Sequence, residues 1–193
     1  MKKLALFSMI LLYSCSVIMI QYEINTKLVK YISKKKSKLR IRNIAVYGDF
    51  LYALTDAFEE NLNVSMVIFE LKDPENPNKI GEFIIGKKDE AFIGFNNLQL
   101  LGNTLYFAST THFWAVDISD KTHPIKLAKY GEEQYLKEAK IEISNFKRMY
   151  LGITKISGNY AFICREIYRK DGSDDGGILI LDISNPREMK LVS

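Results

Sequence analysis

The residues of this chain that could do chemistry are few, and three of them gather in one acidic stretch. Asp171, Asp174 and Asp175 alternate with serine and glycine in the segment 171–177. Calcium is held by several oxygen ligands on a tight loop, and carboxylates set between glycines supply such ligands. The segment lacks the acid spacing and the later glutamate of an EF-hand loop, so a hairpin tip without metal is the alternative interpretation. Calcium is the one cofactor that the sequence suggests.

The other titratable residues form no recognisable catalytic motif. His112 and His123 belong to no HExxH sequence and to no i, i+4 pair, which argues against a zinc site. The sequence also lacks GxSxG, a P-loop, and a GxGxxG that follows a predicted strand. We therefore expect no catalytic residue and no enzymatic activity.

Cys15 is the residue whose surroundings suggest a modification. A positive start, Met1–Lys3, precedes the apolar run Leu4–Leu12, and the following Leu-Tyr-Ser-Cys resembles a bacterial lipobox ending at Cys15. Residues 1–22 are thus expected to be a lipoprotein signal. A plain signal peptide is one alternative. An uncleaved membrane anchor is another, because the uncharged stretch 4–20 is near the ~17-residue lower limit for spanning a bilayer.

A basic segment follows this start. Residues 23–42 include eight lysines and arginines between Lys27 and Arg42. Anionic lipid surfaces attract such clusters, and a single lipid chain binds membranes weakly, so the segment would act as a second attachment signal. Aromatic residues are not interleaved with it in a binding pattern, and we expect no nucleic-acid partner. The expected location is the bacterial cell envelope, with the chain exported and tethered to the membrane.

The elements that must position any site repeat along the chain. Gly48, Gly102 and Gly158 are each followed by Asp or Asn, a tight-turn pair, and then by an apolar, aromatic-rich run of strand length. Alternating apolar residues precede each glycine, so each segment is predicted to be a β-hairpin. The repeated runs are Gly48–Thr55, Gly102–Ser109 and Gly158–Arg165.

Two further strands follow each predicted hairpin. The first carries an acidic residue before a polar turn, at Glu70, Asp117 and Asp182. We expect these three carboxylates to accept backbone N–H bonds in turns and not to act as general acids. The second is a short outer strand, and a similar segment precedes the first hairpin. These outer segments are 27–31, 79–83, 126–130 and 191–193.

Four short strands in each unit, recurring at nearly equal spacing, are typical of β-propeller blades. One four-stranded sheet is unable to bury both of its faces, so such units stack on one another. The sequence therefore predicts an all-β, propeller-like array of about three four-stranded blades over residues 43–193. The units lie near 43–94, 95–150 and 151–193, and an ordinary β-sandwich is the alternative.

The units resemble LVIVD repeats, a family of bacterial surface and secreted propeller-like proteins. The resemblance is carried by Leu28-Val29 and Leu191-Val192, by Gly158–Phe162, and by Leu179–Pro186. Thr55, Ser109 and Arg165 depart from it, because the family often has Asp or Asn there. The resemblance implies the propeller-like fold and an extracytoplasmic setting, and it implies no catalytic residues.

Loops that join the second and third strands of each blade are expected on one rim, where repeat proteins place binding residues. These loops are predicted at 56–65, 110–113 and 166–177, and they differ from one another. Solvated turns are the alternative interpretation. The candidate binding residues on this rim are Phe58, Glu59, Glu60, His112 and Arg169.

Two smaller expectations concern single elements. Residues 132–140 are polar and lack β-branched side chains, which favours a short helix. We expect it to lie in a surface linker, and a helix that caps a blade or contacts a partner is the alternative. Cys164 lies in an apolar strand pattern, and we expect a small buried side chain there.

The composition and the motifs together favour a non-enzymatic binding or scaffolding module, with a protein or a glycan as its ligand. A propeller-type hydrolase or sugar-processing enzyme is the first alternative, and a structural envelope component or a fragment of a longer propeller protein is the second. Closed propellers have ~4–8 blades, so three are too few to close a ring. We therefore expect self-association or truncation.

Overall fold

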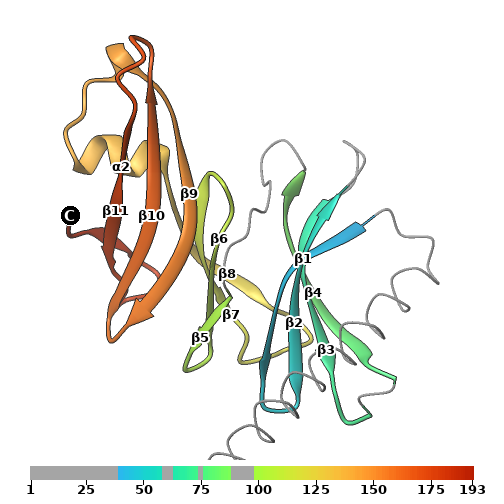
Figure 1. Ribbon diagram of the computed structural model, residues 1–193. Helices are drawn as coiled ribbons and strands as arrows, with labels where there is room; N and C mark the ends of the chain where they lie inside the picture. The colour runs from blue at the N-terminus through green and yellow to red at the C-terminus, as the bar shows by residue number, and fades with distance from the viewer. Residues whose placement is uncertain (1–38, 58–62, 74–75, 88–97) are drawn as a thin grey trace, which may run out of the picture.

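The computed structural model describes residues 39–57, 63–73, 76–87 and 98–193 (Figure 1). The described chain forms three antiparallel four-stranded sheets, each a simple meander of consecutive strands. Sheet A contains β1 (Leu39–Tyr47), β2 (Phe50–Ala57), β3 (Asn63–Glu70) and β4 (Asn78–Lys87). Sheet B contains β5 (Gln99–Leu101), β6 (Thr104–Ala108), β7 (His112–Asp117) and β8 (Ile125–Gly131). Sheet C contains β9 (Phe146–Ser157), β10 (Tyr160–Arg169), β11 (Asp175–Asp182) and β12 (Lys190–Leu191).

The predicted hairpin turns are present at all three glycines. Gly48, Gly102 and Gly158 have φ values of 57°, 58° and 55°. Among the described residues the Asp or Asn after each glycine has no positive φ, so each loop has the left-handed residue first, as in a type II′ turn. Tyr47 pairs with Phe50 across the first of these two-residue loops. The twist of such a turn matches that of the strands, and this explains why glycine opens each one.

The sheets stack face to face in chain order, with sheet A at one end and sheet C at the other (Figure 1). For each sheet we call the face that points along the stack in the direction from C to A the head face, and the opposite face, which points in the direction from A to C, the tail face. The tail face of sheet A packs on the head face of sheet B, and sheets B and C repeat this arrangement. The A–B boundary buries Tyr52, Leu54, Met66 and Ile68 against Leu105, Phe107, Trp114 and Val116.

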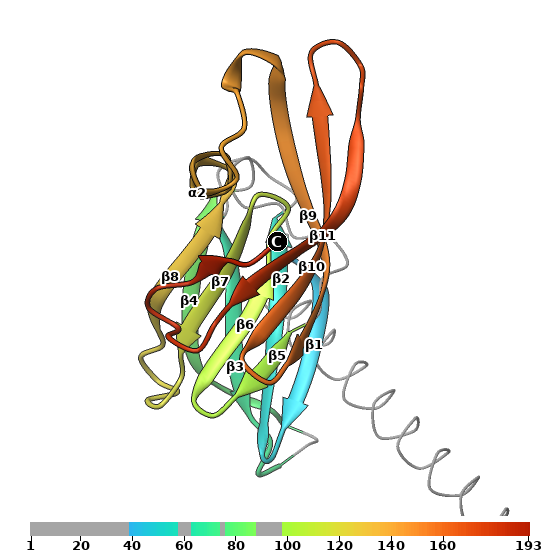
Figure 2. The same ribbon diagram turned by 90° about the vertical axis from the view of Figure 1, so that its left-hand side faces the viewer.

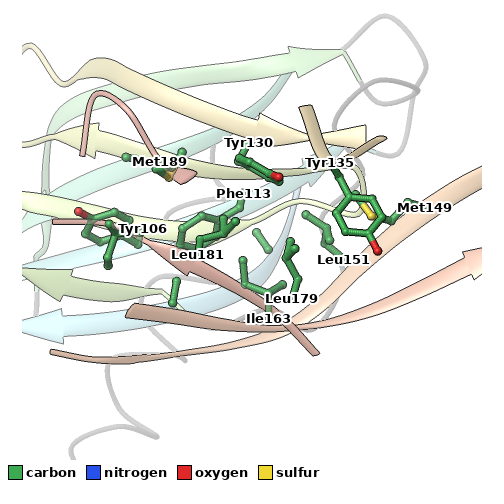
Figure 3. Packing of buried hydrophobic residues seen from close by; sticks show 14 of the residues in the cluster. Tyr106, Phe113, Tyr130, Tyr135, Met149, Leu151, Ile163, Leu179, Leu181 and Met189 are labelled. Atoms are coloured by element: carbon green, nitrogen blue, oxygen red, sulfur yellow. The ribbon is translucent and has the colours of Figure 1, made fainter. Parts of the chain in front are cut away.

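The boundary between sheets B and C holds the larger core cluster. Tyr106 and Phe113 stack with their rings 5.7 Å apart and meet Ile163, Leu179 and Leu181 of sheet C (Figure 3). The prediction of an all-β, propeller-like array of three four-stranded blades is therefore confirmed. The outer segment predicted at 27–31 lies outside the described residues.

The short helix expected near residue 132 is present as α2 (Glu132–Glu138), followed by the 3₁₀ turn η1 (Ile143–Asn145). Its placement inside a surface linker was wrong. Tyr135 is buried in the core between sheets B and C, and Glu138 accepts a backbone N–H bond from Leu191 at 2.7 Å. Glu132 likewise accepts the N–H of Met149 at 3.1 Å. The helix thus fastens sheet C to the end of β8.

Sheet C extends farther than the other two sheets. The segment 166–177 was predicted to be a loop, but β10 continues to Arg169 and β11 begins at Asp175. Strand pairing continues from Arg165, opposite Gly177, to Ile167, opposite Asp175. We call residues 166–176 the hairpin arm. Figure 2 shows it projecting beyond the ends of sheets A and B.

Candidate functional site

The acidic position of the repeat closes a turn in sheets B and C. Asp117 accepts the backbone N–H of Ser119, and Asp182 accepts that of Ser184, both at 2.8 Å. These bonds hold the pKa of each aspartate below its usual range, because they stabilise the charged form. The expectation that these carboxylates anchor turns is confirmed. Glu70 differs, because its carboxylate pairs with Lys72 at 2.8 Å.

A backbone hydrogen bond just after each acidic position recurs in all three sheets. The N–H of Leu71 donates to the carbonyl of Asp49 at 2.8 Å, and Ile118 and Ile183 donate in the same way to Asn103 at 2.9 Å and Asn159 at 2.8 Å. The third strand is thereby tied to the glycine turn between the first two strands. The repeated polar residues therefore position the sheets themselves.

The positions that depart from the family pattern also have structural roles. The Thr55 hydroxyl donates to the Ser65 carbonyl at 3.0 Å and accepts the Ser65 N–H at 3.2 Å. Ser109 makes the same pair of bonds with His112, at 3.2 and 3.1 Å. Both hydroxyls close the far end of a hairpin. In sheet C, where the hairpin continues as the arm, Arg165 stands at this position and pairs with Asp175 at 3.3 Å.

Two side chains that the sequence analysis missed link neighbouring sheets near their first strands. The Tyr47 hydroxyl donates to the carbonyl of Leu98 and accepts the N–H of Leu100, both at 3.2 Å. The Gln99 amide bonds the carbonyl of Thr154 at 2.7 Å and the N–H of Ile156 at 2.9 Å. Each bridge reaches the backbone two and four residues before the next turn glycine. The two side chains differ in type and in position, so the sequence carries no signal for them.

His112 lies at the rim but does not project from it. It is the first residue of β7, so its placement inside the predicted loop 110–113 was wrong. Its ring lies 5.8 Å from that of Trp114, and Nδ1 is 2.9 Å from the Thr111 hydroxyl. Burial, assisted by the nearby Lys129 ammonium, lowers the pKa of His112 to about 4. The imidazole is therefore neutral near pH 7 and packs as an aromatic side chain.

The carboxylates of the hairpin arm each have a different partner. Asp171 accepts the N–H and the hydroxyl of Ser173, and these bonds lower its pKa to about 2. Asp174 accepts the backbone N–H of Arg169 at 3.1 Å, and Asp175 pairs with Arg165. In the described part of the chain, no group of three or more His, Cys, Asp or Glu side chains is arranged to hold a metal ion. Calcium stays a prediction, measurable as a shift in melting temperature at millimolar calcium.

The tip of the arm, just after Arg169, is held from one side by η1. The N–H of Lys170 donates to the Asn145 carbonyl at 2.9 Å, and the Lys170 ammonium reaches the Ser144 carbonyl at 2.9 Å. The Asn145 amide donates to Asp171 at 2.6 Å. These bonds fix a charged loop at a distance from the stacked cores. The arm is the part of the predicted rim for which the structure provides a rigid support.

Other predicted site residues lie elsewhere. Phe58, Glu59, Glu60 and Cys15 fall outside the described residues, so the first rim loop and the lipidation site stay predictions. Cys164 was expected to be buried, but it is exposed. Its position in β10 corresponds to Leu54 and Ala108, which are both buried by the following sheet. Cys164 lies on the tail face of sheet C, where no described sheet follows.

The chain was compared with known proteins. A family model described as the LVIVD repeat matches residues 95–131 and 154–193. The chain carries LVIVD repeats. The matched ranges correspond to sheets B and C, and sheet A has the same strand order, turn glycine and backbone bond as these LVIVD repeats. No curated protein matches the chain. No helix among the described residues has the length and apolar character needed to cross a membrane.

Proposed function

We propose that this LVIVD repeat protein is a non-enzymatic binding or scaffolding module of the bacterial cell envelope, and that its hairpin arm contacts the partner. The repeated polar residues support this proposal. Asp117, Asp182, Thr55 and Ser109 all bond to backbone within their own sheets. Since the shared residues maintain the fold, a specific function belongs to the features that differ between the sheets.

The arm is the largest of these differences, and it carries the proposal. It projects past the stack (Figure 2) and is braced by η1 through the bonds to Asn145 and Ser144. A braced loop loses little conformational freedom when a partner binds, which favours affinity. Arg169 and Asp174 give the arm charge of both signs. Such a surface fits a polar protein or glycan surface.

The N-terminal segment would supply the location. Lipidation at Cys15, together with the basic residues of 23–42, would give the two attachment signals that stable membrane binding requires. The arm would then be presented outside the membrane by a folded stack. Feeding cells a labelled fatty acid and comparing the wild type with Cys15→Ala tests the anchor. Loss of label and of membrane-fraction protein in the variant is the expected result.

Site-specific photo-crosslinking tests the arm. A photoreactive amino acid replaces the exposed Ser173 at the arm tip, and a control protein carries it at the exposed Lys126 of sheet B. Envelope extracts are irradiated with each protein. We expect one crosslinked species from position 173 that is absent from position 126 and is competed by unlabelled wild type. Equal capture at both positions, or no competition, would refute the arm as the contact.

A further inference from the structure

The tail faces of the three sheets have the same design but differ in what covers them. Two positions in the second strand and two in the third strand make up each face. They are Tyr52, Leu54, Met66 and Ile68 in sheet A, and Tyr106, Ala108, Phe113 and Ala115 in sheet B. The corresponding residues of sheet C are Phe162, Cys164, Ile178 and Ile180.

In sheets A and B the following sheet buries all of these side chains. Met66 and Phe113 are both 0% exposed. Ile178, at the corresponding position of sheet C on β11, is 59% exposed, and Ile153, on β9 at the other side of β10, is 58% exposed. Side chains of this size are seldom left open together at the centre of a sheet unless they form an interaction surface. The tail faces of sheets A and B, which are built from the corresponding positions, are each covered by the following β-sheet.

From these positions we infer that the tail face of sheet C is a dimerisation surface, on which the tail face of a second copy of this chain packs about a two-fold axis. The inference does not rest on the proposed function. It fits the two stacked boundaries already present, because a sheet would again cover the same four positions. The apolar centre consists of Ile153, Phe162, Cys164, Ile178 and Ile180.

The head face of sheet A explains why the second copy offers its own tail face. In the A–B and B–C boundaries a tail face meets a head face. The head face of sheet A consists of Leu51, Ala53, Val67 and Phe69, and these residues are already only 0–6% exposed in the single chain. Among the two end faces of the described stack, the exposed apolar one that a second copy brings is therefore its own tail face of sheet C, and identical faces pair through two-fold symmetry.

The polar residues around the apolar centre are arranged for such pairing. Lys155 is opposite Phe162 in the strand register, and Glu166 lies four residues farther along β10. Both are exposed, and Cys164 is midway between them. An axis near Cys164 would place Lys155 of one protomer beside Glu166 of the partner subunit, twice. Unlike charges at the rim orient a pair of surfaces, and a shifted axis would lose both contacts.

Aromatic side chains continue this rim toward the arm. Tyr150 and Tyr168 meet edge to face with ring centroids 5.5 Å apart, and the Arg148 guanidinium donates to the Tyr150 hydroxyl at 2.6 Å. Tyrosine and arginine are enriched in protein interfaces, and tyrosine is ordered at a low cost in side-chain entropy. With the axis near Cys164, Tyr168 would face Tyr160 of the partner subunit, and Tyr160 is itself exposed.

Sedimentation of the full chain in density-matched detergent tests the inference. The wild type is expected to show a concentration-dependent monomer–dimer equilibrium. Ile178→Lys should weaken the dimer by at least roughly 100-fold, because it buries a charge at the centre of the interface. Ile125→Lys is the matched control, since Ile125 is 53% exposed on sheet B, away from the tail face of sheet C. It should leave the dimer intact, and the melting temperature of each variant reports whether the fold is kept.

Crosslinking tests the symmetry. In the Cys15→Ala protein Cys164 is the one remaining cysteine. A short bis-maleimide that spans the ~10 Å spacing of packed sheets should join two chains through Cys164. The Ile125→Lys change should preserve this crosslink, and Ile178→Lys should abolish it. A wild-type monomer at all concentrations, a dimer that survives Ile178→Lys, or a dimer without the Cys164 crosslink would each overturn the inference.

Discussion

At the scale of single residues, the acidic side chains of the repeat act on the backbone beside them. Asp117 and Asp182 each bind the N–H two residues later, and both are largely open to solvent. Their type and spacing predicted this role correctly from the sequence, because an aspartate before a polar turn is an efficient local acceptor. Residue type and spacing were thus sufficient to predict that these two aspartates anchor turns.

Replacing Asp117 by alanine should lower the free energy of unfolding by about 0.5–1 kcal/mol, a small value because the bond is exposed to solvent. Asp117→Asn keeps an acceptor oxygen and should lose less. The lowered pKa means that the charged form stabilises the fold at neutral pH, and that this stabilisation is lost as the pH falls below about 3.8. Urea unfolding of both variants at pH 7 and pH 3 measures the difference. Equal loss in the two variants at pH 7 would contradict the turn role.

His112 predicts a second pH effect. Its pKa falls from 6.5 to about 4 on folding, so the unfolded chain binds the proton more readily. The fold should therefore lose stability as the pH falls from 6.5 toward 4, by roughly 1–2 kcal/mol once partial exposure is allowed for. His112→Gln should flatten this slope in unfolding measurements. His123→Gln, at a ring that is 83% exposed, is the control and should change it much less.

At the scale of elements, the hairpins were the most predictable part of the chain. A glycine followed by Asp or Asn between apolar runs specified the turn, and the structure places all three glycines at positive φ. The length of β10 was not predicted, because the acidic, glycine-containing residues 171–177 indicated a loop that was extended back over the strand formers Ile167 and Tyr168. Ile167 on this extension is buried in the core that also contains Tyr135 of α2, and this burial favours the strand. The bridges of Tyr47 and Gln99 depend on tertiary placement and left no local pattern.

The turn geometry gives a direct test. Gly102→Ala should cost about 1–2 kcal/mol, because an L side chain is strained at φ 58° even though no atom lies within 4 Å of the added Cβ. Gly176→Ala in β11 is the matched control. Its added Cβ would lie 4.0 Å from the backbone carbonyl oxygen of Arg165, an ordinary van der Waals contact, and its φ is not positive. Chemical denaturation should show a loss in the first variant and little change in the second. Equal losses would mean that strand flexibility, and not the left-handed turn, explains the glycine.

At the scale of the whole molecule, the sequence repeat predicted the array of blades, but it did not predict that the tail face of sheet C is exposed. Periodicity predicted stacked sheets, and the cores between A and B and between B and C have that form. The exposure of the Cys164 side chain could not be predicted from the sequence of its own strand, because that sequence has the same pattern as the strands of Leu54 and Ala108, which are buried. Only the order of the sheets in space makes the difference. In the described chain, the A–B core contains no residue of sheet C, and the B–C core none of sheet A.

This separation of the cores predicts local consequences of a core mutation. Leu181→Ala, at a fully buried side chain of the B–C core, should cost about 2–5 kcal/mol. Amide exchange should accelerate at Ala161 and Tyr106, which border that core, while Leu54 in the A–B core keeps its protection. Hydrogen-exchange mass spectrometry resolves the two regions. Uniform acceleration in all three sheets would show that the stack unfolds as one cooperative unit.

The Gln99 bridge and the Tyr47 bridge have a mechanical consequence. Each joins two sheets near their first strands, while the outer strands of neighbouring sheets are held by side-chain packing. Pulling the chain apart between Leu39 of sheet A and the arm of sheet C would load these bridges in series, one after the other. Under force such a molecule should lengthen in discrete steps, one per sheet, and still hold its remaining sheets folded between the steps.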